Sequence, residues 1–241
     1  MKKLIALSIA DAKNISRDST LLLILFGPFA VFGLLKFLIP FATSMLLDKL
    51  SFEFIPYYPL IVSFMILIPS MMFGLLTGFV ILDERDEEII SYIAITPLRR
   101  TGYLAYKILS SFVVSFLFCF VVIYLTGLST IPWKYAPGIA AMVALEAPIT
   151  TFFLAAFAEN KVEGLALSKV VGIMFFAPFI AYFVKSGWSY VAGIFPPFWI
   201  TKAFFAAQAG ASSYWLFLFA GVIVHVIFIF LLVKKFVDNE R

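Results

Sequence analysis

Six apolar runs decide what this chain can fold into. They cover residues 20–40, 57–82, 104–128, 136–158, 165–185 and 214–233. A helix of about 20 apolar residues crosses the ~30 Å hydrocarbon core of a bilayer. Within lipid, only helices and closed barrels satisfy their backbone polar groups. The sequence therefore predicts an all-α integral membrane protein with six transmembrane helices.

The composition leaves no room for a soluble domain. Hydrophobic residues make up 63% of the chain and charged residues only 13%, against about 25% charged in a soluble domain. The longest polar connection is about 20 residues, too short for a domain of its own. Residues 1–241 are therefore predicted to form a single transmembrane domain. One cysteine, Cys119, excludes an internal disulfide framework.

The orientation follows from the basic residues. If the N-terminus lies inside, the outer connections and span ends hold five of the 18 lysines and arginines: Lys36, Lys49, Lys134, Lys185 and Lys202. The other thirteen then lie on the inner side. Cytoplasmic segments carry the excess of lysine and arginine, so both termini are predicted to be cytoplasmic.

Residues 1–19 precede the first run and are amphipathic. On a helical wheel the apolar side chains fall on one side, and Lys2, Lys3, Lys13 and Arg17 cluster on the other. This pattern is typical of a helix that lies on a membrane surface with its basic face toward anionic headgroups. The alternative is a cleaved signal peptide, which MKKLIALSIADA loosely resembles.

The connection before the last span, residues 186–213, is too apolar for a free loop. Pro196-Pro197 forbids one continuous helix. We predict two short re-entrant helices near the outer interface, anchored by Trp188 and Trp199. A plain aromatic belt is the alternative.

No catalytic or metal-binding motif is present. The chain has no Gly-Lys pair for a nucleotide-binding P-loop and one histidine, too few for a multi-histidine metal site. Glu87-Glu88 raises the possibility of an intramembrane glutamate protease, but the arginine that such a motif needs four residues later is Tyr92. We expect no catalytic residues, no metal site, no cofactor bound by this chain and no nucleic-acid partner.

Two ionisable residues lie midway along spans. Glu146 precedes Pro148 in the fourth run, and His225 lies in the sixth. A charge at that depth is costly, so such groups are usually buried against protein or water. Glu146 belongs either to a substrate or proton path or to an interhelical hydrogen bond, and His225 is open to the same two interpretations. Gly74-x-x-x-Gly78 would allow close helix approach.

Residues 83–100 hold the densest charge in the chain. Glu84, Asp86, Glu87 and Glu88 are predicted to form the first turns of a helix, where carboxylates favour the positive end of the dipole. Isoleucines then supply an apolar side, and Pro97 ends the helix. A short amphipathic helix held between two spans is suited to docking on a soluble partner. A solvated turn with a charged flank is the alternative.

This loop resembles the first cytoplasmic loop of ABC-2 transporter permeases, which runs Glu-Arg-x-x-Gly-Thr, an apolar turn, then Thr-Pro and a basic residue. Glu84-Arg85 and Thr96-Pro97 stand at the matching spacing, while Glu88 and Ile89 replace Gly-Thr. The resemblance implies a coupling helix on the ATP-binding subunit. Its expected contact residues are Glu84, Arg85, Asp86, Glu87, Glu88, Tyr92, Thr96 and Pro97.

The resemblance extends over the whole chain, and residues 155–169 and 195–205 are similar to small drug-export permeases named as fluoroquinolone exporters. It implies a permease subunit in a prokaryotic cell membrane, paired with a second permease subunit in a homo- or heterodimer. ATP and Mg would bind the partner ATPase. The expected function is outward transport of a hydrophobic or amphipathic compound. The alternative is a channel or membrane scaffold that needs no ATP.

Overall fold

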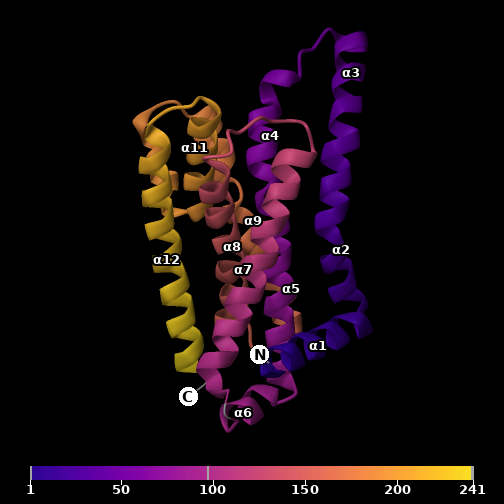
Figure 1. The fold of residues 1–241 in the computed structure, drawn as a ribbon, viewed down its shortest axis with the longest axis vertical. Helices are drawn as coiled ribbons and strands as arrows, with labels where there is room; N and C mark the ends of the chain where they lie inside the picture. Colours follow the sequence, from indigo (N-terminus) through magenta and orange to yellow (C-terminus); the bar gives the residue numbers. More distant parts are fainter. Residues whose placement is uncertain (1, 97, 240–241) are drawn as a thin grey trace.

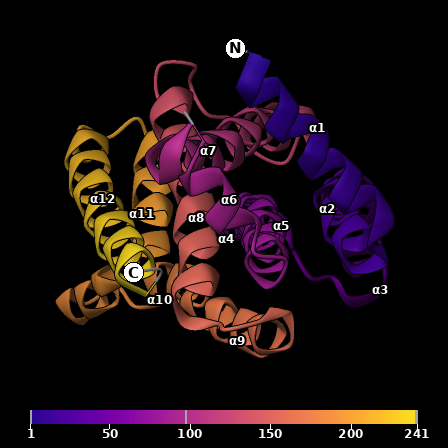
Figure 2. The same cartoon turned by 90° about the horizontal axis from the view of Figure 1, so that it is seen from below.

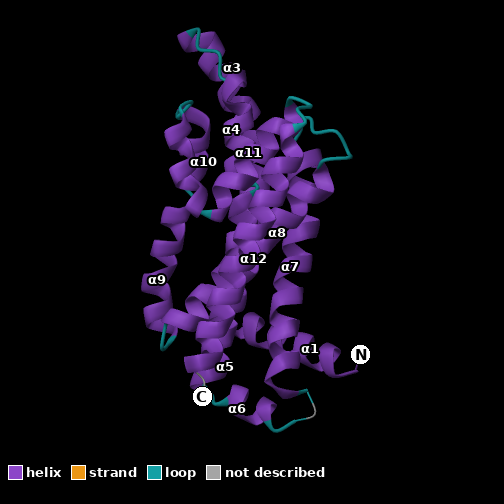
Figure 3. Cartoon of the chain, turned by 90° about the vertical axis from the view of Figure 1, so that its left-hand side faces the viewer, coloured by secondary structure: helices purple, strands orange, loops and turns teal. Residues whose placement is uncertain are grey.

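The computed structural model describes residues 2–96 and 98–239, with side chains described from Leu7 onward. These residues form helices joined by short connections, and no strand occurs among them (Figure 3). Six of the described helical segments are long and apolar enough to cross a membrane: Ser19–Leu50, Ile55–Asp86, Arg99–Leu125, Ala136–Phe157, Lys161–Phe183 and Ser213–Asn239. The six predicted spans are therefore confirmed, and the chain is a multi-pass membrane protein.

Several spans combine shorter elements. The first contains α2 (Ser19–Gly33), the π-helix η1 (Leu34–Leu38) and α3 (Ile39–Leu50), and the second contains η2 (Ile55–Tyr57), α4 (Tyr58–Met65) and α5 (Leu67–Asp86). The others are α7 (Arg99–Leu125), α8 (Ala136–Phe157), α9 with α10 (Lys161–Met174, Ala177–Phe183) and α12 (Ser213–Asn239). Outside the spans lie α1 (Lys2–Arg17), α6 (Ile89–Ala94), η3 (Gly187–Ile194) and α11 (Pro196–Gln208).

Both chain ends lie at the same end of the bundle, here called the lower end, which carries α1, α6 and the last turn of α12 (Figure 1). α1 runs crosswise to the spans there, and α6 forms the lowest point. At the opposite, upper end α3 reaches beyond α11 and α12 (Figures 1 and 3). The shared end of the two termini agrees with an even number of spans.

The core of the bundle is built on α8. Seen from below, α8 lies between α12 and α5 (Figure 2), and it packs on both and on α7. Most of its side chains are buried, and many are alanine. Small side chains let neighbouring helices approach closely where lipid supplies no hydrophobic driving force. α8 is therefore the element against which the other spans are positioned.

The glycine stripe of α5 makes the closest of these approaches. A Cβ atom on Gly74 would lie 2.5 Å from the carbonyl oxygen of Ala147, and one on Gly78 would lie 3.0 Å from Leu154. The hydroxyl of Ser70, one turn away, donates to the Val143 carbonyl at 2.6 Å. The close approach predicted from Gly74-x-x-x-Gly78 is confirmed.

Prolines act in two ways in this fold. Pro196 opens α11 after an extended Phe195, which confirms the predicted break and the two short helices of residues 186–213. By contrast, Pro40, the last residue of the first apolar run, does not end the first span, because the helix continues to Leu50. The Ile39 N–H bonds the Leu34 carbonyl five residues back, and this wider π turn accommodates the proline ring.

Candidate functional site

The lower end of the bundle gathers most of the predicted site residues, but with a different local structure. α5 continues through the acidic cluster to Asp86, Glu88 takes a left-handed conformation with φ of 57°, and only then does α6 begin at Ile89. The prediction that Glu84, Asp86, Glu87 and Glu88 start the loop helix is therefore wrong. The reason is that Glu84 and Arg85 have partners inside the bundle. These contacts extend α5 by a turn.

The short helix α6 displays an apolar surface away from the spans. Tyr92 is 65% exposed and Ile95, which directly follows the helix, is 85% exposed, whereas Ile90 is buried against the spans. The nearby predicted residues Asp86, Glu87, Glu88 and Thr96 are also exposed. Pro97 lies outside the described residues. α6 thus combines an anchored side with an exposed side that is apolar and flanked by carboxylates.

Glu84 is buried, which contradicts its expected place on an exposed acidic surface. It accepts hydrogen bonds from the Tyr103 hydroxyl at 2.5 Å and from Lys107 Nζ, and it forms an ion pair with Lys107 at 3.0 Å. Lys107 is fully buried and also pairs with Asp11 of α1 at 2.9 Å. Tyr106 donates to the other carboxylate oxygen of Asp11. One lysine of α7 therefore ties α1 to α5.

A second ionic cluster joins the start of the first span to α5 and α9. Lys161 Nζ lies 2.7 Å from Asp18 and 2.9 Å from Asp83. Asp18 also caps α2, because its Oδ1 accepts from the backbone N–H groups of Thr20 and Leu21. The hydrogen bond from Lys161, together with these backbone donors, lowers the pKa of Asp18 below its usual value.

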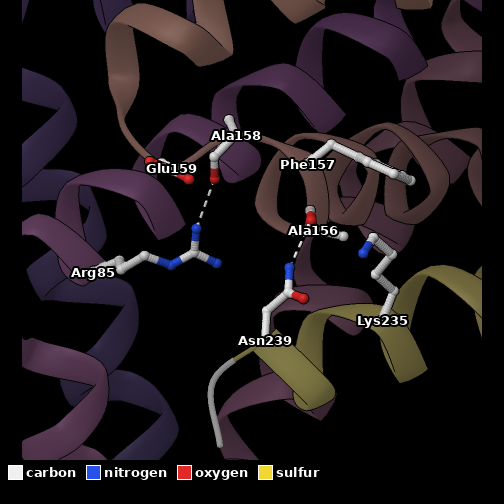
Figure 4. A pocket seen from close by; sticks show the side chains of 7 residues that line it. All are labelled: Arg85, Ala156, Phe157, Ala158, Glu159, Lys235 and Asn239. Atoms are coloured by element: carbon white, nitrogen blue, oxygen red, sulfur yellow. Dashed lines mark hydrogen bonds between the residues drawn. The ribbon is translucent and has the colours of Figure 1, made fainter.

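Arg85 caps the lower end of α8 instead of facing outward. Its guanidinium donates to the carbonyls of Ala158 at 2.8 Å and Ala155 at 2.5 Å, and Asn239 of α12 donates to Ala156 at 2.8 Å. Helices leave their last carbonyls without intrahelical partners. Figure 4 shows Arg85 reaching the Ala158 carbonyl and Asn239 reaching the Ala156 carbonyl, beside a cavity of about 510 Å³. α5 and α12 are thereby fixed to the same helix end.

The two intramembrane residues Glu146 and His225 contact each other. His225 Nε2 lies 3.2 Å from Glu146 Oε1, and Nδ1 lies 2.6 Å from the Gly221 carbonyl. Both side chains are buried. A carbonyl only accepts, so Nδ1 carries a proton. The bond between Nε2 and the Glu146 carboxyl group needs one further proton, on either atom.

The sequence did not indicate this pairing, or that Lys107, Asp11 and Tyr103 would meet. Lys107 is one of the thirteen basic residues predicted to lie on the inner side. The sequence signal for this cluster was the spacing of Tyr103 and Lys107. They are four residues apart inside an apolar helix, which places both on one face. Among the described residues, no group of three or more side chains is arranged to hold a metal ion.

Comparisons with known proteins match nearly the whole chain. Two Mycobacterium tuberculosis proteins, named "Fluoroquinolones export permease protein", from strains H37Rv and CDC 1551, are each 26% identical to this chain. Each alignment covers 94% of this chain and 90% of the relative. No solved structure matches the chain. The family model described as "Fluoroquinolones export permease protein Rv2686c-like" matches residues 11–233. The chain therefore belongs to the Rv2686c-like family of fluoroquinolone export permeases.

Proposed function

We propose that this protein is the membrane-spanning permease subunit of an ABC-2 type exporter that moves an amphipathic compound outward, with a fluoroquinolone as the first candidate substrate. A separate subunit binds and hydrolyses ATP with Mg. Two permease subunits form one pathway. The family supports an export permease, and the single observation that carries the ATP-driven part is the exposed apolar side of α6.

The lower end is cytoplasmic in this proposal, since it holds most of the lysines and arginines. α1 then lies along the inner membrane surface, and α6 projects into the cytoplasm. Tyr92 and Ile95 would gain nothing from exposure to water. They fit instead into a cleft on a soluble partner, with Glu87 and Glu88 meeting basic or polar groups at its rim.

The contacts around α6 explain how a push on it would reach the spans. α6 lies between α5 and α7, which are joined by the Glu84–Lys107 ion pair. Arg85 links the same end of α5 to α8, and Asp83 links it to α9 through Lys161. A displacement of α6 is therefore carried to several spans together, which suits rigid-body rocking between inward- and outward-facing states.

The test is a search of the neighbouring reading frames for a protein with a P-loop, followed by reconstitution of this chain with that protein. Export of a fluoroquinolone from vesicles should require ATP and both proteins. Tyr92→Ala with Ile95→Ala should abolish co-purification with the ATPase and ATP-dependent export, while membrane insertion stays normal. Glu53→Lys, an exposed change at the upper end, is the control and should leave both intact. Export without ATP, or a chain that binds no ATPase, would favour the channel or scaffold alternative.

A further inference from the structure

A small cavity at the lower end lies apart from the α6 surface. It has a volume of about 200 Å³ and lies between α1, α2, α5 and α7. α5 forms its back, through Phe73, Leu76 and Thr77, and α1 contributes Asp11. On the α7 side its wall includes Val114, which is 46% exposed. In a membrane, that exposed face of α7 meets lipid, so the cavity is reached from the bilayer.

The polar atoms of this cavity are hydrogen-bond acceptors. Thr77 donates its hydroxyl proton to the Phe73 carbonyl, and Ser110 and Ser111 donate theirs to the Lys107 carbonyl. Tyr106 donates to Asp11. A hydroxyl group has one proton and two lone pairs. The Tyr106 oxygen also lies 3.2 Å from Ser8 Oγ. Free acceptor capacity therefore remains on Thr77, Ser110 and Ser111, and a ligand must supply the donors.

The charge of the cavity also favours a cation. Asp11 is the carboxylate in its lining, and none of the described residues that line it is a lysine or an arginine. Glu84 and Lys107 do not line the cavity, but Asp11 and Glu84 share the single ammonium group of Lys107. Two carboxyl groups and one ammonium either carry one negative charge or hold an extra proton. A cation in the cavity replaces that proton or neutralises that charge.

From these observations we propose that the cavity binds the protonated amine end of a small amphipathic amine that enters from the cytoplasmic leaflet. A cavity of about 150 Å³ holds a benzene ring, so this one admits an ammonium group with one ring, and the rest of the molecule stays in the lipid. A phosphatidylethanolamine headgroup is disfavoured, because its phosphate would face the same acceptor-lined wall. This inference rests on the proposed export function and specifies a substrate class and an entry site.

The test measures binding without ATP or a partner. The probe is 4-fluorobenzylammonium, followed by ¹⁹F NMR line broadening with the full chain in phosphatidylcholine nanodiscs. The matched probes 4-fluorobenzoate and 4-fluorobenzyl alcohol have the same ring but an anionic or neutral end. We expect saturable binding of the amine, no binding of the benzoate, and affinity for the alcohol lower by about tenfold. Equal binding of the three probes would overturn the proposal.

Variants locate the site. Thr77→Val and Ser110→Ala keep the shape but remove acceptors, and each should weaken amine binding by about threefold to tenfold. Asp11→Asn should weaken it by about tenfold or more. Ser168→Ala is the control, because Ser168 on α9 bonds its own helix in the same way but lies outside the cavity. If Asp11→Asn does not fold, the Thr77→Val and Ser110→Ala variants test whether the amine binds in this cavity. Unchanged binding in both would overturn the assignment.

Two further experiments distinguish an amine ligand from a lipid headgroup, and the cavity proposal from the exporter proposal. Nanodiscs with phosphatidylethanolamine should leave probe binding unchanged, and displacement of the probe by this lipid would assign the cavity to a headgroup instead. Binding that persists in a chain shown not to export would leave this site standing while the exporter proposal fails. Fluoroquinolone export without any amine binding at this cavity would overturn the cavity proposal and leave the exporter proposal standing.

Discussion

His225 Nε2 and Glu146 Oε1 lie 3.2 Å apart within the membrane-spanning region, on two helices, α12 and α8, whose burial differs sharply. Of the most apolar 18-residue stretch of α8, 83% is buried, against 17% for α12. The pair therefore fixes a helix with few buried residues to the most buried of the six spans, at a depth where an unpaired charge costs at least about 2.5 kcal/mol.

Glu146→Gln tests whether this pair is only structural. A glutamine amide donates to Nε2 while Nδ1 keeps its proton, so the hydrogen bond survives without a titratable carboxyl group. We expect unfolding free energy within about 1 kcal/mol of wild type and unchanged export, whereas Glu146→Ala should lose about 1–3 kcal/mol. The measurements are unfolding in mixed micelles and vesicle export. Normal assembly without export in Glu146→Gln would instead assign Glu146 to the transport path.

Lys107→Met tests the ionic cluster at the lower end. Removing the ammonium leaves the carboxyl groups of Glu84 and Asp11 without their cation, and breaking such a buried pair costs about 3–5 kcal/mol. The loss should appear in the unfolding free energy. The double variant Lys107→Met with Glu84→Gln should recover part of it. A single variant as stable as wild type would mean that the cluster contributes nothing to stability.

Gly74→Ala tests the contact between α5 and α8. The added methyl group would lie 2.5 Å from the Ala147 carbonyl, which forces the helices apart, and overpacking costs about 1–3 kcal/mol. Gly33→Ala is the matched control, because its Cβ atom would meet no atom within 4 Å. It should be neutral or slightly stabilising, since alanine is the better helix former. Equal melting temperatures for both variants would contradict the predicted contact.

Asp18 predicts a pH dependence of stability. Its folded-state pKa is lowered from a usual value of 3.8, so in acid the unfolded state binds more protons than the folded state. The contribution of this carboxylate is complete above the unfolded pKa and is lost as the pH falls toward the folded pKa. Melting temperature followed from about pH 6 to pH 3 should therefore fall less steeply in Asp18→Asn than in wild type.

Asparagine is a suitable replacement because its Oδ1 can still cap α2, so the change removes the charge and keeps the cap. The control is Asp48→Asn, an exposed aspartate on α3. Its pH profile should match that of wild type. If Asp18→Asn and wild type have parallel profiles, the ion pair with Lys161 does not stabilise the fold.

Arg85→Ala should destabilise the lower end of α8 more than Asn239→Ala. Arg85 donates two charged hydrogen bonds to the helix end, and Asn239 donates one neutral bond. Hydrogen bonds from charged groups contribute about 1.5–3 kcal/mol each and neutral ones about 1 kcal/mol. Hydrogen exchange of the last α8 amides and unfolding in mixed micelles measure the difference. An equal loss in both variants would show that the charge of Arg85 adds nothing.

The periodicity of the sequence was enough to predict the spans, the break at Pro196 and the glycine contact of α5, because each depends on local sequence and on the bilayer. It was not enough to predict which side chains of the acidic loop face the bundle. Whether Glu84 faces water or the bundle depends on Lys107, 23 residues later, and on Asp11 in a helix that precedes the first span. Likewise, Glu146 and His225 are 79 residues apart, and only the packing of α12 on α8 brings them together.

The length of the first span has a consequence for the choice of membrane. Its 32 residues measure about 48 Å at about 1.5 Å per residue, whereas the 22 residues of α8 measure about 33 Å. The central helix thus matches a hydrocarbon layer of about 30 Å, and the first span must tilt or protrude. A thicker bilayer would cover more of α3 without stretching the core, so hydrophobic mismatch is absorbed at the periphery of the protein.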